Sequence, residues 1–410
     1  MEGRTDKMKK FLIILLVVCL AFAAAAGYLL GRKVVAEDAQ PSPSASPAGE
    51  ESQEAAGEPI EAETLDYEAI YALHDPEDIV MLVDGEEINW GEYFSWLYMS
   101  AMQTEQYFVA MASYGMPMSW SDPVGEDPAE TYAAAALEGG ENTLIQIMAI
   151  QGFADSKGIV PSQETLDSID EQVKSDMAAT VGEEGTEEDF QEYLDSLYRS
   201  RDAYDRTIMA NYINVQNFTE SYGLKGEKVS DEQALGYLEE NGYVCANHIL
   251  LATVDLSTGE ALDEETVAEK KALAESLAEE LKAIEEPDKL VERFKELKEE
   301  HCEDTGKTAF PDGYLFRSGE MVEEFENAAM LLEEYGVSEP VESPYGYHII
   351  LRLPLDADAL MGYSSTGEAL NAREYYANYN YALELDAYLE AMEAEYAPDF
   401  TPPELGDYLE

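Results

Sequence analysis

A run of twenty uncharged residues, Phe11–Leu30, lies near the amino terminus and constrains most strongly how this chain folds. At about 1.5 Å per residue, a helix of that length spans a bilayer core of about 30 Å. Basic residues are frequent in 1–10, and Arg32 and Lys33 follow the run. The sequence therefore predicts a single-pass transmembrane helix at 11–30, a cytoplasmic basic end at 1–10, and a body that lies outside the cytoplasm at the cell membrane.

Two other fates of this segment stay open. Ala24–Ala26 fits the small-residue pattern of a signal cleavage site, and cleavage would leave the protein secreted. Cys19 would be the lipid-bearing residue of a lipoprotein, although Val18 stands where such signals place a small residue. The apolar run is longer than the usual signal core of about 7–15 residues, which favours the retained anchor. In all three cases the rest of the chain is exported.

Residues 31–65 form a linker that cannot bury a core. Pro, Ser, Ala and Glu dominate its central part, 37–59, and apolar side chains are almost absent there. Segments of this composition stay extended and repel themselves through their charge. The sequence therefore predicts a tether between the membrane and a folded body.

The acidity of the chain excludes several classes of function. Its 410 residues include 87 Asp and Glu against 24 Lys and Arg, which gives a formal net charge of −63. Nucleic-acid binding needs basic side chains to neutralise phosphates, so we expect no nucleic-acid partner. Three cysteines are too few for a disulfide scaffold and allow at most one bridge within the exported body, Cys245–Cys302.

Residues 66–237 and 357–410 have the apolar spacing of a mainly helical module, and the second range ends in a Pro-rich acidic tail. Phe190–Tyr222 and Ala372–Tyr396 are each predicted to form one long helix. Three polar residues stand directly before helical runs and are predicted N-caps: Asn89, Ser162 and Ser230.

Residues 238–356 have a mixed pattern instead. A strand-like run at Val244–Leu251 is followed by two helices, a Gly-rich segment at Lys307–Gly319, a third helix and two short strands that end with Gly346–Leu353. With one more strand in the Gly-rich segment, this order predicts a small α+β domain on a four-stranded sheet, inserted in the helical module.

Three of the four histidines fall in this mixed domain. His248 lies in its first strand and His348 in its last. Two strand histidines in one small domain favour a functional site more than a single one does. A metal site built from His248, His301 and the neighbouring cysteines Cys245 and Cys302 is the alternative. Residues three apart in a strand point to opposite faces, so Cys245 and His248 would not converge on one ion, and we expect no metal.

Residues 243–354 resemble a parvulin-type peptidyl-prolyl cis-trans isomerase domain, and the flanking helices resemble membrane-attached exported foldases of the PrsA and SurA kind. Val83–Ile88 and Lys157–Ser162 carry the second resemblance. The parvulin motifs, in chain order, are Asn247-His248-Ile249-Leu250, Cys302–Gly306, Asp312–Phe316, Ser318–Phe325 and Val341–Ile350.

The parvulin resemblance implies a four-stranded antiparallel sheet and a site that needs no cofactor. It implies that His248 and His348 form a hydrogen-bonded pair coupled to Asp304, with Cys302 as the alternative third residue. It also implies that Met321 and Phe325, four residues apart on one helix face, form the floor for the proline ring, although plain core packing of these two side chains is the alternative. Rotation about the amide needs no nucleophile, so the pair would act through electrostatic preorganisation.

The sequence departs from the parvulin pattern at two places. Phe310–Tyr314 replaces a Gly-Gly-Asp-Leu-Gly run, and Tyr345 stands where some parvulins have a serine. Thr253–Glu269, the loop in which phosphate-directed parvulins carry basic residues, contains no Lys or Arg. We therefore expect no preference for phosphorylated substrates.

These features together predict an isomerase and chaperone that assists the folding of exported polypeptides containing X–Pro bonds. The resemblance also allows a homodimer. A noncatalytic holdase that keeps the parvulin fold as a binding module is the alternative, and the changed Pro311–Tyr314 segment leaves room for it. A surface adhesin or scaffold would leave His248 and His348 unexplained.

Overall fold

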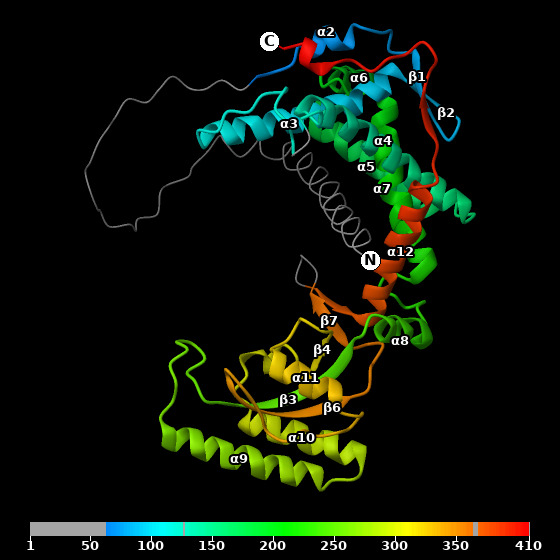
Figure 1. The fold of residues 1–410 in the computed structure, drawn as a ribbon. Helices are drawn as coiled ribbons and strands as arrows, with labels where there is room; N and C mark the ends of the chain where they lie inside the picture. The colour runs from blue at the N-terminus through cyan, green and yellow to red at the C-terminus, as the bar shows by residue number, and fades with distance from the viewer. Residues whose placement is uncertain (1–62, 126–127, 364–367, 410) are drawn as a thin grey trace, which may run out of the picture. The chain divides into compact units, whose positions relative to one another are not determined.

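The computed structural model describes residues 63–125, 128–363 and 368–409, and the chain divides into two compact units (Figure 1). The first unit takes the described parts of Met1–Gly152, Ser162–Asn211 and Ala391–Glu410, and the second takes those of Phe153–Pro161 and Tyr212–Glu390. The predicted anchor at 11–30 lies outside the described residues, as does nearly all of the linker. Within the described ranges, no helix is long and apolar enough to cross a membrane.

Helices make up most of the first unit, and a small antiparallel sheet in the order β2-β1-β9 accompanies them. In chain order, the elements that lie in or enter this unit are α2 (Tyr67–Tyr71), β1 (Ile79–Val83), β2 (Glu86–Asn89), α3 (Trp90–Ser113), α4 (Tyr132–Ser156), α5 (Gln163–Val181), α6 (Glu187–Asp195), α7 (Arg201–Tyr222), β9 (Ala394–Tyr396) and the short η2 (Leu405–Asp407).

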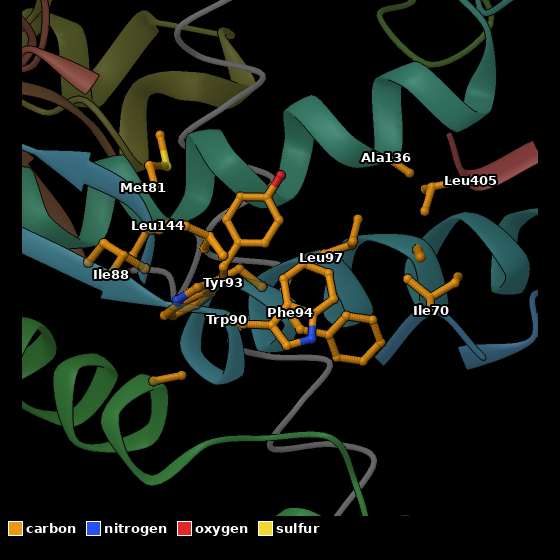
Figure 2. Packing of buried hydrophobic residues seen from close by; sticks show 14 of the residues in the cluster. Ile70, Met81, Ile88, Trp90, Tyr93, Phe94, Leu97, Ala136, Leu144 and Leu405 are labelled. Carbon is orange, nitrogen blue, oxygen red and sulfur yellow. The ribbon is translucent and has the colours of Figure 1, made fainter. Parts of the chain in front are cut away.

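The core of the first unit forms around the start of α3 (Figure 2). Asn89 caps this helix as predicted, because its side chain accepts the Glu92 N–H at 2.8 Å. Trp90 and Phe94 are fully buried one turn apart, and the Trp90 indole donates to the Tyr71 carbonyl at 2.8 Å. The cap therefore fixes the turn at which the largest aromatic side chains enter the core.

The prediction of one helix over Phe190–Tyr222 is wrong, because the chain breaks between α6 and α7. Tyr198, in the break, takes a left-handed backbone conformation with φ of 49°. Its ring packs against Tyr71 and Phe94 at centroid distances of 5.4 and 5.5 Å. A continuous helix does not allow this backbone conformation, so the helix is interrupted where the Tyr198 ring packs into the core.

The prediction of one helix over Ala372–Tyr396 is also wrong. The helix α12 (Ala372–Leu389) ends early, and Ala394–Tyr396 forms β9 at the edge of the first unit's sheet. The backbone groups of β9 bond to β1, where Met81 is paired with Tyr396. Pairing between strands so distant along the chain cannot be recognised from the local pattern of apolar residues.

The second unit contains the predicted four-stranded antiparallel sheet, in the order β4-β3-β6-β5 (Figure 1). Helices α9 and α10 cover one face of it and α11 covers the other. Its elements are α8 (Asp231–Glu240), β3 (Val244–Ala252), α9 (Glu264–Lys282), α10 (Pro287–His301), η1 (Thr305–Thr308), β4 (Tyr314–Phe316), α11 (Glu323–Leu331), β5 (Val341–Ser343), β6 (Gly346–Leu353), β7 (Leu360–Tyr363), β8 (Ala369–Asn371) and α12.

The two faces of this sheet bury different side chains, because successive residues of a strand alternate in direction. Ile249 and Ile349 pack with α9 and α10, and Ala246 and Ile350 pack with α11. His248 shares the period of Ala246 and therefore lies on the α11 face. After the sheet, β7 and β8 form a two-stranded ribbon, and β7 runs beside β4.

Candidate active site

The two strand histidines meet on the α11 face of the sheet. In the register of β3 and β6, His248 is paired with Ile350 and Leu250 is paired with His348. The two histidines are therefore diagonal neighbours on one face, a relation that brings side chains within reach of each other. Their ring centroids lie 5.1 Å apart, nearly edge to face, and the residues are 8% and 3% exposed.

Asp304 completes this cluster from the turn after α10. Its Oδ2 lies 3.0 Å from His248 Nε2 and accepts the Tyr314 hydroxyl at 2.6 Å. Its Oδ1 accepts the Gly306 N–H at 2.9 Å. Hydrogen bonds to a carboxylate stabilise its charged form, and the bond with His248 is the main reason that the pKa of Asp304 lies well below its usual value.

The two histidines differ in charge although they are neighbours. Burial lowers the pKa of His248, but the bond to Asp304 and the nearby Cys302 outweigh it and raise the pKa overall. Burial, together with the positive charge of His248, lowers the pKa of His348 to about 3. Asp304 therefore stabilises the protonated form of His248, while the neighbouring His348 stays a neutral imidazole near neutral pH.

The hydrogen bond expected between the two histidines is not formed. His348 Nε2 lies 2.7 Å from the Ser343 hydroxyl, and the Nδ1 atoms of both histidines are buried without a hydrogen-bond partner. The register places the rings edge to face, and each Nε2 is engaged elsewhere. The two buried nitrogens are the polar groups in the cluster whose hydrogen-bonding capacity is unused.

We expect an NMR titration of the imidazole nitrogens to separate the two histidines. The folded pKa of His348 is about 3 against about 6.5 unfolded. The unfolded chain thus binds a proton between these values that the folded chain does not, and stability falls as pH drops through this window. His248 has the opposite sign, because its raised pKa contributes stability that is lost as pH rises through it. Two histidines titrating together near pH 6.5 would contradict this assignment.

Phe325 lies beside the histidines, and Met321 packs against the apolar cluster that contains Phe325. Phe325 is 2% exposed, and its ring centroid lies 5.2 Å from that of His248 and 5.7 Å from that of His348. Met321 is half-buried against the same apolar cluster, but it precedes α11, so the two do not share one helix face. Phe325 therefore joins the polar cluster to the apolar cluster in which Met321 packs.

Of the remaining chemical candidates, Cys302 lies beside His248 and helps to raise the pKa of that imidazole. Cys302 accepts the Leu250 N–H at 3.4 Å and donates to the His248 carbonyl at 3.8 Å, so it contacts the β3 backbone, while Asp304 meets the His248 ring nitrogen. Cys245 and Cys302 are both buried and free, so the disulfide that the sequence allows is not formed. In the described part of the chain, no group of three His, Cys, Asp or Glu residues is placed to hold a metal ion.

The sequence did not predict a place in the cluster for two of its polar residues, Tyr314 and Ser343. Both stand in the quoted motifs, but only the fold shows that their hydroxyls reach Asp304 and His348. The hydroxyl of Tyr314 requires a glycine at position 306, because a Cβ there would lie 2.2 Å from that hydroxyl. The glycine leaves room for that hydroxyl beside the carboxylate.

Comparison with known proteins agrees with this geometry. Residues 248–353 match the family model described as Rotamase: PPIC-type PPIASE domain, which confirms the resemblance to parvulins. Foldase protein PrsA of Halalkalibacterium halodurans is 32% identical over 227 residues, which cover 54% of this chain and 58% of that protein. Foldase protein PrsA of Oceanobacillus iheyensis is 28% identical over 213 residues, 52% of this chain and 58% of the relative.

The matched part of this chain thus spans less than two thirds of these relatives. Among solved structures, the crystal structure of PrsA from Bacillus subtilis matches with 18% identity, covering 66% of this chain and 91% of that one at a TM-score of 0.24.

Proposed function

We propose that this chain is a parvulin-type peptidyl-prolyl cis-trans isomerase that acts as a foldase on exported polypeptides. The observation that carries the proposal is the cluster of the buried His248 and His348 with the half-buried Asp304, within the segment that matches the PPIC-type domain. Phe325 lies directly beside it, and Met321 packs in the same apolar cluster as Phe325.

The chemistry that this site must perform is noncovalent. Rotation about an X–Pro bond has a barrier of about 18–20 kcal/mol, because the planar amide is stabilised by resonance. Met321 and Phe325 would hold the prolyl ring, while the hydrogen-bonded pair of His248 and Asp304 would favour the charge distribution of the twisted amide. Both partners are fixed before the substrate arrives, so no reorganisation is needed during rotation.

We assign the isomerase to residues 238–356 and the binding of unfolded chains to the helical segments 66–237 and 357–410. The uncharged run at 11–30 and the linker at 31–65 would hold this body outside the cytoplasm at the cell membrane, or release it if the run is cleaved. The clients would be unfolded or partly folded exported polypeptides, and dimerisation stays a prediction.

A protease-coupled or NMR-exchange assay on the full chain tests the isomerase directly. The substrates are Ala-Xaa-Pro-Phe peptides with Glu, Leu or Lys before the proline. We expect catalysed exchange with all three. A folded chain that accelerates none of them, yet still suppresses aggregation of an unfolded protein, would make the holdase the correct function.

We expect no preference for phosphoSer-Pro over Glu-Pro peptides. The nearby Lys270 is paired with Glu303, and the Lys307 ammonium donates to the Cys302 carbonyl at 2.8 Å, so a phosphate would have to compete with these partners for both ammonium groups. A single charge-assisted phosphate contact would be worth about 1.4 kcal/mol, or roughly tenfold in affinity. Comparison of kcat/KM for the two peptides tests this, and a tenfold phosphate preference would contradict it.

A further inference from the structure

A row of aromatic side chains leads away from the candidate active site toward β7. The Tyr314 ring centroid lies 5.6 Å from that of His248, and Phe310 lies 4.9 Å from Tyr314 with its ring tilted by 32°. Tyr363 at the end of β7 lies 6.4 Å from Phe310, at 71°. The row extends from the buried polar cluster to an exposed ring, because Phe310 and Tyr314 are half-buried and Tyr363 is 51% exposed.

Hydrogen bonds from Lys298 and Asn247 fix the backbone at Phe310 and Pro311, in the middle of this row. Lys298 on α10 is buried, and its ammonium donates to the carbonyls of Phe310 and Pro311 at 2.9 and 3.1 Å. The Asn247 amide donates to the Pro311 carbonyl at 3.3 Å. A buried charge binding two carbonyls fixes the backbone that carries Phe310, so its ring is placed in advance of any contact with a ligand.

The outer end of the row comes from a different part of the chain. Tyr363 lies beyond residues 248–353, the part that matches the PPIC-type domain model. Its hydroxyl points to the Ala309 carbonyl at 3.5 Å, next to Phe310. The ribbon of β7 and β8 therefore extends the surface that adjoins the site with a residue that the isomerase domain alone would lack.

We propose that Tyr314, Phe310 and Tyr363 form an accessory subsite that binds an aromatic or large apolar side chain of the polypeptide near the isomerised X–Pro bond. This inference rests on the proposed isomerase function and names the substrate class that the site selects. Aromatic rings add about 0.5–1.5 kcal/mol per pair beyond the burial of their area. The row is continuous with the His248 cluster, and an extended chain covers its three ring-to-ring steps with at most about five residues.

The test is a phenylalanine scan of the substrate on the full chain. One phenylalanine is moved through each position from three residues before the proline to three residues after it, with alanine elsewhere. We expect at least one position to raise kcat/KM by about three- to tenfold through a lower KM. Tyr363→Ala and Phe310→Leu should each reduce that ratio toward one, and Tyr363→Leu distinguishes loss of the ring from loss of the side chain's bulk.

Tyr375→Ala is the matched control, because Tyr375 is also exposed and lies on α12, outside the row. It should leave the ratio unchanged. An equal response of the wild-type chain to all peptides, or a ratio that survives both Tyr363 variants, would overturn the inference. If no peptide is turned over, the proposed function fails, and fluorescence anisotropy with labelled peptides then tests the row by itself: phenylalanine-dependent binding that is lost in Tyr363→Ala supports it, and uniform binding sinks it.

Discussion

Replacing His248 with alanine should lower kcat/KM for X–Pro isomerisation by about a hundredfold, the scale on which removal of one preorganised charge-bearing donor acts. The side chain is buried, bonds to Asp304 at 3.0 Å and contacts both Phe325 and His348. The substitution removes the imidazole that bonds to Asp304 and leaves this carboxylate with the Tyr314 hydroxyl and the Gly306 N–H as donors. The measurement is the exchange rate of Ala-Leu-Pro-Phe by NMR, with circular dichroism to verify the fold.

His301→Ala provides the matched control for this experiment. His301 belongs to the same domain but lies at the end of α10, outside the cluster. Its Nε2 lies 3.6 Å from Glu300 Oε1. It should keep wild-type turnover. The His248→Ala variant should still suppress aggregation, because we assign the binding of unfolded chains to the helical segments and not to the isomerase site. Full isomerase activity in His248→Ala would remove the histidine from the mechanism, and loss of both activities in a folded variant would mean that they share one surface.

The sequence was sufficient to place the histidines because both lie in short, nearly continuous apolar runs that are typical of strands buried on both faces. Once the β3–β6 pairing forms, register alone brings His248 and His348 to one face. The four-stranded sheet followed from the order of strands and helices for the same reason. Asp304 required the family resemblance, since nothing local distinguishes it from other acidic residues in a chain with 87 of them.

What the sequence did not reveal depends on contacts between residues distant along the chain. The bond from Ser343 to His348 and the bond from Tyr314 to Asp304 exist only after the strands have paired. The break at Tyr198 has the same origin, because its ring packs against residues more than a hundred positions away. Local propensity cannot encode such contacts, so helix breaks and hydroxyl partners were missed while caps such as Asn89 were found.

Gly346→Ala should be the most destabilising single-methyl substitution in the sheet domain, with a loss of at least about 3 kcal/mol in the free energy of unfolding. Gly346 begins β6 with φ of 146°, and a Cβ there would lie 2.2 Å from the Leu251 carbonyl oxygen and 2.8 Å from the Ala252 Cα. Both atoms belong to the backbone of β3, so no side-chain rotation relieves the clash. The β3–β6 pairing that aligns the two histidines would have to shift.

Gly319→Ala separates the clash from the cost of the left-handed backbone. Gly319 has φ of 90°, but a Cβ there would meet nothing within 4 Å, so only about 1–2 kcal/mol of conformational strain is expected. Hydrogen exchange of the β3 and β6 amides under native conditions measures both variants. The fluorescence of Trp90, Trp96 and Trp120, which all lie in the first unit, reports that unit by itself. Because the two variants share the strain and differ in the clash, an equal acceleration of exchange in both would show that the close approach of β6 to β3 contributes nothing to stability. A much larger effect at Gly346 would show that a glycine is required where the two histidine-bearing strands begin to pair.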